Sequence, residues 1–258
     1  MSYALITGAS KGIGKAISEA LAKRKVNLLL SARSEQLLKT SAEDLKKKFG
    51  IDAQYFPADL SLPESAAALA TWCKKNNFPI NILVNNAGYG LWGDFMELTL
   101  EEQLSMLHIN TASIISLTHL LLPELIKNTP SYILNIASTT AYQAIPRFAV
   151  YSASKTFIVS FSRALNRELK KSGVSVTCLS PGTTDSGFID RARMKAMEEI
   201  AAKFSMPAET VAEFGVKAMF ARKKEVVPGF SNVTGAIAAK FLPKDVVEGI
   251  AQNLYRKR

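Results

Sequence analysis

The stretch Thr7-Gly8-Ala9-Ser10-Lys11-Gly12-Ile13-Gly14 decides the fold of this chain. It joins a short apolar run to a helical pattern that begins at Ile13, as a dinucleotide-binding strand–loop–helix unit requires. Gly8 permits a sharp turn, Gly12 lets the backbone approach a pyrophosphate, and Gly14 lets helix and strand pack closely. The N–H groups at the helix start would then face the anion. The glycine spacing is Gly-x3-Gly-x-Gly, not the commoner Gly-x-Gly-x2-Gly.

Short aliphatic runs alternate with longer helical patterns along the rest of the chain. Each run is apolar through most of its length, as expected of parallel strands buried on both faces. The alternation predicts right-handed βαβ crossovers and an α/β fold with a doubly wound parallel sheet, which is Rossmann-like. The expected strands are residues 4–7, 27–32, 53–56, 82–85, 132–136, 174–179 and 225–227; the expected helices are residues 13–24, 35–49, 62–75, 100–127 and 152–171.

Two helix starts carry the pattern of a capping box, a Ser or Thr followed three residues later by Glu. Ser61 with Glu64 is expected to begin one helix, and Thr99 with Glu102 another.

The length of 258 residues, 48% of them hydrophobic, suits one large α/β domain or two small ones. There is no linker, repeat or low-complexity tract, so we expect a single domain over residues 1–258. No apolar run approaches the roughly 20 residues that span a bilayer, and the N-terminus has no signal-like segment. Cys73 and Cys178 are too few for a disulfide framework and are expected to be buried thiols in a reducing cytoplasm. With only two His, no metal site is expected.

The formal net charge is +10, which would suit an anionic partner. The basic runs, however, lie near the ends of expected helices, where cations complement the helix dipole and stay solvated. We therefore expect no nucleic-acid or membrane partner, with attraction of acidic surfaces or anionic substrates as the alternative. The runs are Lys23-Arg24-Lys25, Lys46-Lys47-Lys48, Arg222-Lys223-Lys224 and Arg256-Lys257-Arg258.

The end of the second expected strand indicates which nucleotide binds. A chain that prefers NAD usually has Asp or Glu there to bind the ribose 2′-hydroxyl. Here the strand ends Ser31-Ala32-Arg33, without an acid. Arg33, together with Lys11 of the glycine loop, is placed to neutralise a 2′-phosphate, so we expect NADP(H). The alternative is that both are ordinary surface cations.

Tyr151 and Lys155 stand four residues apart and share one face of the helix expected there. A free phenol has a pKa of about 10 and is a weak acid–base catalyst at neutral pH, but a cation one turn away stabilises the phenolate. Ser138, thirteen positions before the tyrosine, can hydrogen-bond an oxygen held between the two. Such a pair also arises by chance, so its weight depends on the rest of the chain.

An ordered set of motifs surrounds this pair: the glycine loop, Asn85-Asn86-Ala87-Gly88, Asn110, Ser138, Tyr151-x3-Lys155 and Pro181-Gly182. The set resembles the short-chain dehydrogenase/reductase family in its compact, single-domain type. The similarity runs from residue 3 to about residue 233.

The resemblance implies four catalytic residues. Tyr151 would be the general acid–base, and Lys155 would favour its deprotonated form while holding the nicotinamide ribose hydroxyls. Ser138 would position the substrate oxygen. Asn110, midway along the long helix, would hold a water that relays protons to Lys155.

The resemblance also implies contacts along the whole cofactor. Asp59, with Leu60, matches the position that contacts the adenine, the backbone of Asn86-Ala87-Gly88 would line the cofactor, and Pro181-Gly182-Thr183 would cradle its nicotinamide end. The cofactor-binding residues implied are Gly8, Ser10, Lys11, Gly12, Ile13, Gly14, Arg33, Asp59, Leu60, Asn86, Ala87, Gly88, Tyr151, Lys155, Pro181, Gly182 and Thr183.

Residues 183–206, called the lid segment below, interrupt the strand–helix alternation. An amphipathic insertion after a strand's carboxyl end is expected to cover a substrate, although a surface helix packed on the core has the same pattern. Arg147 is a candidate for a substrate carboxylate. The side chains that would line an apolar pocket, or serve only in packing, are Tyr89, Trp92, Phe95, Tyr142, Ile145, Phe148, Phe188, Met194 and Met197.

The sequence thus predicts an NADP(H)-dependent oxidoreductase that transfers a hydride between the cofactor and a carbonyl or secondary alcohol, with an apolar ketone or aldehyde as substrate. Two alternatives stay open. One is a 3-oxoacyl thioester (acyl-carrier) reductase, whose acidic carrier protein suits the +10 charge; the other is a non-catalytic NADP-binding sensor or scaffold. The long helices, residues 100–127 and 152–171, are apolar beyond one stripe. In this family such helices pair across a two-fold axis, so we expect a cytoplasmic homodimer or homotetramer.

Overall fold

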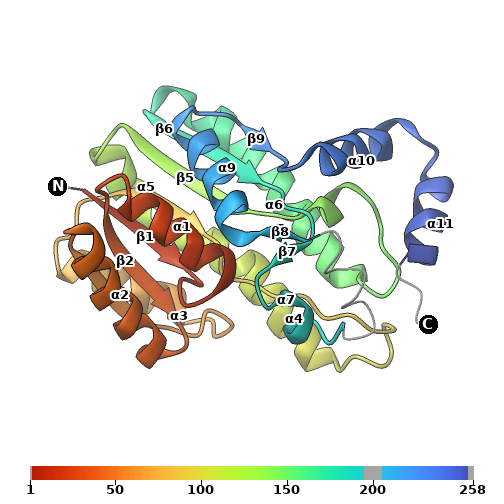
Figure 1. Ribbon diagram of the computed structural model, residues 1–258, viewed down its shortest axis with the longest axis horizontal. Helices are drawn as coiled ribbons and strands as arrows, with labels where there is room; N and C mark the ends of the chain where they lie inside the picture. Colours follow the sequence, from red (N-terminus) through yellow and green to blue (C-terminus); the bar gives the residue numbers. More distant parts are fainter. Residues whose placement is uncertain (1, 195–204, 255–258) are drawn as a thin grey trace.

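A computed structural model describes residues 2–194 and 205–254. Within these residues, seven strands form one parallel sheet in the order β3-β2-β1-β4-β5-β6-β9 (Figure 1). The strands are β1 (Tyr3–Thr7), β2 (Asn27–Ala32), β3 (Ala53–Pro57), β4 (Ile80–Asn85), β5 (Ser131–Ile136), β6 (Val174–Leu179) and β9 (Glu225–Val226); the short strands β7 (Thr184–Asp185) and β8 (Met206–Pro207) pair with each other.

Helices cover both faces of the sheet. One layer contains α1 (Gly12–Ala22), α2 (Glu35–Phe49) and α9 (Ala208–Phe220), and the other contains α3 (Ser65–Lys75), α5 (Ser113–Lys127) and α6 (Ala149–Glu168). The remaining labelled helices are α4 (Leu100–Leu107), α7 (Phe188–Arg191), α10 (Phe230–Phe241) and α11 (Lys244–Leu254). In Figure 1, α10 and α11 extend from the β9 edge of the sheet.

The central strands are buried on both faces. In β1, Ala4 and Ile6 belong to the core cluster under α1, α2 and α9, while Leu5 belongs to the cluster under α3 and α5. Successive side chains of a strand point to opposite faces, so an uninterrupted apolar run fills two cores at once. The predicted α/β class and doubly wound parallel sheet are confirmed, and every expected strand is present with ends shifted by at most two residues.

One capping box was predicted correctly and the other was not. Thr99 Oγ1 accepts from the backbone N–H of Glu102 (3.2 Å), and the Glu102 carboxylate accepts from the N–H of Thr99 (3.3 Å). The prediction at Ser61 was wrong, because α3 begins only at Ser65. Ser61 instead donates from its N–H and hydroxyl to Asp59 Oδ1, at 3.0 and 2.7 Å, and this local turn replaces the cap.

The long helix expected over residues 100–127 is continuous but not uniform. α4 and α5 are joined by a π-helical turn, His108–Ala112. By length and composition alone, the run Leu100–Lys127 could cross a membrane. Its side chains Leu117, Leu121 and Leu125 are fully or almost fully buried in the cluster under the sheet, which makes this run a core helix of the fold.

The order of the strands reverses beside β1, whose neighbours are β2 on one side and β4 on the other. Loops that leave the carboxyl ends of β1 and β4 therefore turn to opposite faces and leave a crevice between them. The glycine loop and the segment that follows Asn85 meet at this crevice.

Candidate functional site

The carboxyl ends of the strands border a cavity of about 1160 Å³. Gly14, Asp59 and Asn110 are not on its surface, and each contacts a residue or loop that is. The other residues that the sequence singled out for catalysis or cofactor binding all line it: Gly8, Ser10, Lys11, Gly12, Ile13, Arg33, Leu60, Asn86, Ala87, Gly88, Ser138, Tyr151, Lys155, Pro181, Gly182 and Thr183.

The loops after β1 and β4 are held together by side-chain bonds. Thr7 Oγ1 accepts from the N–H groups of Asn86 and Ala87, both at 3.0 Å, and the Asn86 amide donates to the Thr7 carbonyl at 2.9 Å. Gly8 has φ +65°, and a Cβ there would lie 2.7 Å from Asn86 Nδ2. A side chain at Gly14 would collide with the Gly8 carbonyl. The turn is therefore restricted to glycine by conformation and by space.

Helix α1 presents its N-terminus to the cavity. Lys11 occupies the N-cap position and makes no side-chain cap. Gly12 and Ile13, the first residues of the helix, line the cavity, and the first N–H groups of a helix have no acceptor within it. Together with the positive end of the helix dipole, this is an arrangement that binds phosphate.

Two arginines that line the cavity, Arg33 and Arg191, act on the carboxylate of Asp59. Arg33 follows β2 and lines the cavity, and Asp59 follows β3. Partial burial raises the pKa of Asp59, but the hydrogen bonds from Ser61 and the charges of Arg33 and Arg191 outweigh it, so the carboxyl stays ionised with a pKa below its usual range. Its turn with Ser61 holds Leu60 in the cavity wall.

Tyr151 and Lys155 lie one turn apart near the start of α6, as their spacing predicted. Both are buried, at 6% exposure each, and Lys155 Nζ lies 5.6 Å from the centroid of the Tyr151 ring. Lys155 donates to the carbonyl oxygen of Ile136 at 3.1 Å. Burial lowers the pKa of Lys155 to about 8, so the ammonium is still charged at neutral pH, next to a phenol that lines the same cavity.

Asn110 lies in the π-helical turn and is completely buried. Its Oδ1 accepts from the N–H of Tyr89 (3.1 Å), and its Nδ2 donates to the Tyr89 carbonyl and to Ser154 Oγ, both at 3.0 Å. Ser154 in turn donates to the carbonyl of Tyr151 at 2.6 Å. The wider turn thus connects the loop after β4 to the helix that carries Tyr151. Ser154 was missed from the sequence, where its place inside the Tyr151-x3-Lys155 motif was its only signal.

Ser138 follows β5 and lines the cavity. Its Oγ accepts from the N–H of Thr140 (3.2 Å) and so caps the short 3₁₀ turn Thr139–Tyr142. Among the described residues we find no acceptor for its hydroxyl hydrogen. A substrate oxygen in the cavity can therefore take that hydrogen bond.

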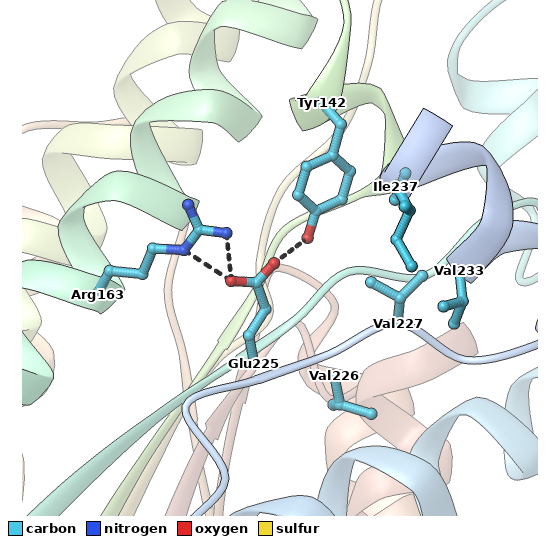
Figure 2. Close-up of a pocket in the computed structure, with 8 residues that line it drawn as sticks. Tyr142, Arg163, Glu225, Val226, Val227, Val233 and Ile237 are labelled. Atoms are coloured by element: carbon cyan, nitrogen blue, oxygen red, sulfur yellow. Dashed lines mark hydrogen bonds and ion pairs between the residues drawn. The ribbon is translucent and has the colours of Figure 1, made fainter. Parts of the chain in front are cut away.

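Tyr142, a candidate for the substrate pocket, lies elsewhere, so that expectation was wrong. Its hydroxyl donates to Glu225 (2.6 Å) and lies 3.0 Å from Ser180 Oγ, while Glu225 also binds Arg163 (Figure 2). Burial and the hydrogen bond to Glu225 raise the pKa of Tyr142. This group lines a separate cavity of about 270 Å³. Figure 2 shows it with Val233 and Ile237 of α10, which line the same cavity. Tyr142 therefore fixes the turn after Ser138 to β9.

The wall next to Tyr151 is apolar, but not all the expected side chains form it. Trp92 and Ile145 are buried in a cluster behind the wall, and Phe95 is 61% exposed. Arg147 pairs with Asp94 at 3.0 Å and stacks on Trp92, so it is committed away from the cavity. Met197 lies outside the described residues. The candidates that do line the cavity are Tyr89, Phe148, Phe188 and Met194, and Ile189 joins them.

Two polar contributors were missed from the sequence. Asn232, in α10, lines the cavity and fills the space beside Gly182, where a Cβ would lie 2.5 Å from its amide. Arg191, in α7 of the lid segment, lines the cavity with its guanidinium 4.4 Å from the centroid of the Tyr89 ring. No pattern in the sequence separates Arg191 from Arg193, which points out to Glu102.

Comparisons with known proteins identify the family of this chain. The family model described as short chain dehydrogenase matches residues 2–196. The very-long-chain 3-oxoacyl-CoA reductase of Rattus norvegicus is 34% identical over 69% of this chain, which spans only 58% of that protein. The ketoacyl reductase HetN of Nostoc is 31% identical, over 92% of this chain and 82% of that one.

Solved structures give the same result. A short-chain dehydrogenase from Sphingobium yanoikuyae in complex with NADPH superposes with a TM-score of 0.82 at 27% identity, covering 98% of this chain and 95% of that one. Actinorhodin polyketide ketoreductase with NADPH superposes with a TM-score of 0.78 at 28% identity, over 88% of this chain and 94% of that one.

Proposed function

This chain belongs to the short-chain dehydrogenase family, and we propose that it is an NADP(H)-dependent oxidoreductase acting on a carbonyl group or a secondary alcohol. The observation that carries the proposal is that the glycine turn and the buried Tyr151–Lys155 pair line one cavity. A phosphate-binding loop and an acid–base group in the same space are what dinucleotide-dependent redox chemistry needs.

The residues present fit the cofactor. The absence of a Cβ at Gly8 lets the glycine turn pack against Asn86 and Ala87, and the start of α1 offers N–H groups to a pyrophosphate. We assign Ser10, Lys11, Gly12 and Ile13 to the phosphates, Arg33 and Lys11 to the 2′-phosphate, and Asp59 with Leu60 to the adenine. The segments 86–88 and 181–183 would hold the nicotinamide half. The NADPH in the Sphingobium relative supports the choice of cofactor.

The chemistry follows from what the site offers. When bound, NADP(H) supplies or accepts the hydride. In reduction, the carbonyl carbon gains the hydride, the C=O π bond breaks and negative charge grows on oxygen. Ser138 and Tyr151 would donate hydrogen bonds to that oxygen, and Tyr151 would then give it a proton. Lys155 would offset the charge left on the phenolate, and the reverse sequence oxidises an alcohol.

For Asn110 we propose two roles. Its side-chain amide is committed to Tyr89 and Ser154, which fixes the loop after β4 and the helix of Tyr151. A water that relays protons to Lys155 would therefore bind its main chain.

The substrate is proposed to be an apolar ketone or aldehyde, because Phe148, Phe188 and Met194 form the wall next to Tyr151. A 3-oxoacyl thioester is the second candidate, favoured by the names of the Rattus and Nostoc relatives. Within one domain, the lid segment would cover this substrate.

We further propose a cytoplasmic homodimer or homotetramer that pairs through the two long helices, residues 100–127 (α4 and α5) and residues 152–171 (mostly α6). Ile115 in α5 is 45% exposed, and α4 exposes Leu104 at 55%. These apolar side chains lie on the outer side of helices whose inner side is already buried, so a second copy would cover them.

The test is NADPH oxidation by the purified chain against ketones, aldehydes and 3-oxoacyl thioesters, repeated with NADH. We expect turnover of at least one apolar carbonyl compound with NADPH, and a slower rate with NADH. A salt-sensitive preference for carrier-bound over free substrate would favour the hypothesis of a 3-oxoacyl thioester reductase. Tight NADPH binding without turnover on any compound would instead indicate a sensor or scaffold.

A further inference from the structure

Arg191 connects the lid segment to the cofactor end of the cavity. It is the last residue of α7, whose first residue, Phe188, has its ring 5.5 Å from that of Tyr151. At the other end of this short helix, the Arg191 guanidinium lies 4.4 Å from the centroid of the Tyr89 ring. Stacking on an aromatic face holds a guanidinium in a defined plane while its N–H groups stay free.

Two arginines that make no ion pair within the described residues, Arg33 and Arg191, line this cavity. The pKa of Arg191 is lowered, first by partial burial and then by the positive charge of Arg33. The Asp59 carboxylate is close to both, but its Oδ1 already accepts two hydrogen bonds from Ser61. Positive charge therefore exceeds negative charge here.

We propose that Arg191 binds the 2′-phosphate of NADP(H) together with Arg33, so that the lid segment itself contributes to the choice between NADP(H) and NAD(H). This inference rests on the proposed function, because it needs the cofactor at the glycine turn. A phosphate dianion between two guanidinium groups would remove their mutual repulsion and take charge-assisted hydrogen bonds from both. The 2′-hydroxyl of NAD(H) is neutral, so it neither offsets the repulsion between the two arginines nor accepts charge-assisted hydrogen bonds from them as a phosphate would.

A second consequence concerns the substrate side. α7 is only four residues long, so a ligand that fixes Arg191 also restricts Phe188, which stands against Tyr151. The 2′-phosphate would thereby order the apolar wall. The KM for the carbonyl substrate should then be higher with NADH than with NADPH, beyond any difference in cofactor affinity.

The experiment measures binding, independently of turnover. Wild type, Arg191→Met and Arg191→Lys are titrated by calorimetry with NADPH, NADH, 2′,5′-ADP and 5′-AMP. Arg191→Met keeps an unbranched side chain over Tyr89 but removes the charge, and should weaken NADPH and 2′,5′-ADP about tenfold. NADH and 5′-AMP should change less than about twofold, since they lack the phosphate. Arg191→Lys should recover part of the loss.

Arg193→Met is the matched control. It lies two residues away in the lid segment, pairs with Glu102 and is not part of the cavity wall, so all four affinities should stay at wild-type values. Equal losses for NADPH and NADH in Arg191→Met would overturn the inference, and so would unchanged NADPH binding. If wild type bound neither dinucleotide, the proposed function itself would fail, which is a different result.

Discussion

Lys155 places its ammonium group 5.6 Å from the ring centroid of Tyr151, and both side chains are buried. The ammonium has one backbone acceptor, the Ile136 carbonyl, and belongs to no ion pair of the described residues. Burial accordingly lowers its pKa to about 8. The fold therefore carries the desolvation cost of a nearly uncompensated charge, and the group that gains from this charge is the neighbouring phenol.

That cost predicts how stability depends on pH. The pKa of Lys155 is about 8 in the folded chain, against 10.5 for a solvated lysine of the unfolded chain, so the unfolded chain binds more protons between these values and stability rises with pH. Across that window, the wild type should gain about 3 kcal/mol of unfolding free energy relative to Lys155→Met. Urea denaturation at a series of pH values measures the difference. Lys170→Met, at an exposed lysine, should follow the wild type; parallel curves for wild type and Lys155→Met would contradict the prediction.

Tyr151→Phe should separate chemistry from binding. Removing the hydroxyl eliminates the proton donor, so kcat for carbonyl reduction should fall by at least about 100-fold. The Kd for NADPH should stay within about twofold, because the ring and its packing remain. Stopped-flow or steady-state NADPH oxidation, with fluorescence titration of NADPH, gives both quantities.

Tyr142→Phe is the matched tyrosine control. Its hydroxyl binds Glu225, outside the site, so activity should persist while the free energy of unfolding drops by about 1 kcal/mol. If both variants kept activity, Tyr151 would not be the acid–base group.

The parts of this fold that could be read from the sequence are those encoded by local pattern. The apolar run Ala4-Leu5-Ile6 of β1 predicted a strand buried on both faces, since polar and apolar residues do not alternate along it. The spacing of Tyr151 and Lys155 predicted one shared helix face, because helical geometry fixes it.

What could not be read depends on tertiary placement. Arg191 and Arg193 have the same chemistry two residues apart, and only the path of the lid segment directs the first into the cavity and the second towards Glu102. Tyr142 ends the short turn that Ser138 caps, but β9, more than eighty residues later, supplies its partner Glu225. Ser61 failed as a cap since Asp59, two residues earlier, competes for it.

Thr7→Val should loosen the junction between the loops after β1 and β4. Valine has nearly the shape of threonine but leaves the N–H groups of Asn86 and Ala87 without their acceptor. Thr7 is 1% exposed, so water does not replace the oxygen, and the unfolding free energy should fall by about 2 kcal/mol or more. Thr7→Ser keeps the oxygen and should retain most of the stability and the NADPH affinity. Equal losses in the two variants, by urea denaturation, would show that the methyl group matters and the hydrogen bonds do not.

Gly8→Ala tests whether the turn is restricted by backbone conformation or by the approach of the second loop. Gly8 and Gly50 have almost the same φ, +65° and +62°, but a Cβ at Gly50 meets nothing within 4 Å, whereas one at Gly8 meets Asn86 Nδ2 at 2.7 Å. Gly50→Ala should therefore cost only the conformational term, about 1 kcal/mol. Gly8→Ala must also displace Asn86 or the Ala87 backbone, and we expect a loss of at least about 2 kcal/mol more. Thermal and urea denaturation compare the stabilities, and a titration with NADPH should show weakened binding for Gly8→Ala alone. Similar losses of stability in both variants would mean that the loop after β4 moves away from the new Cβ at little cost. Close packing against Asn86 and Ala87 would then not be the reason for a glycine at position 8.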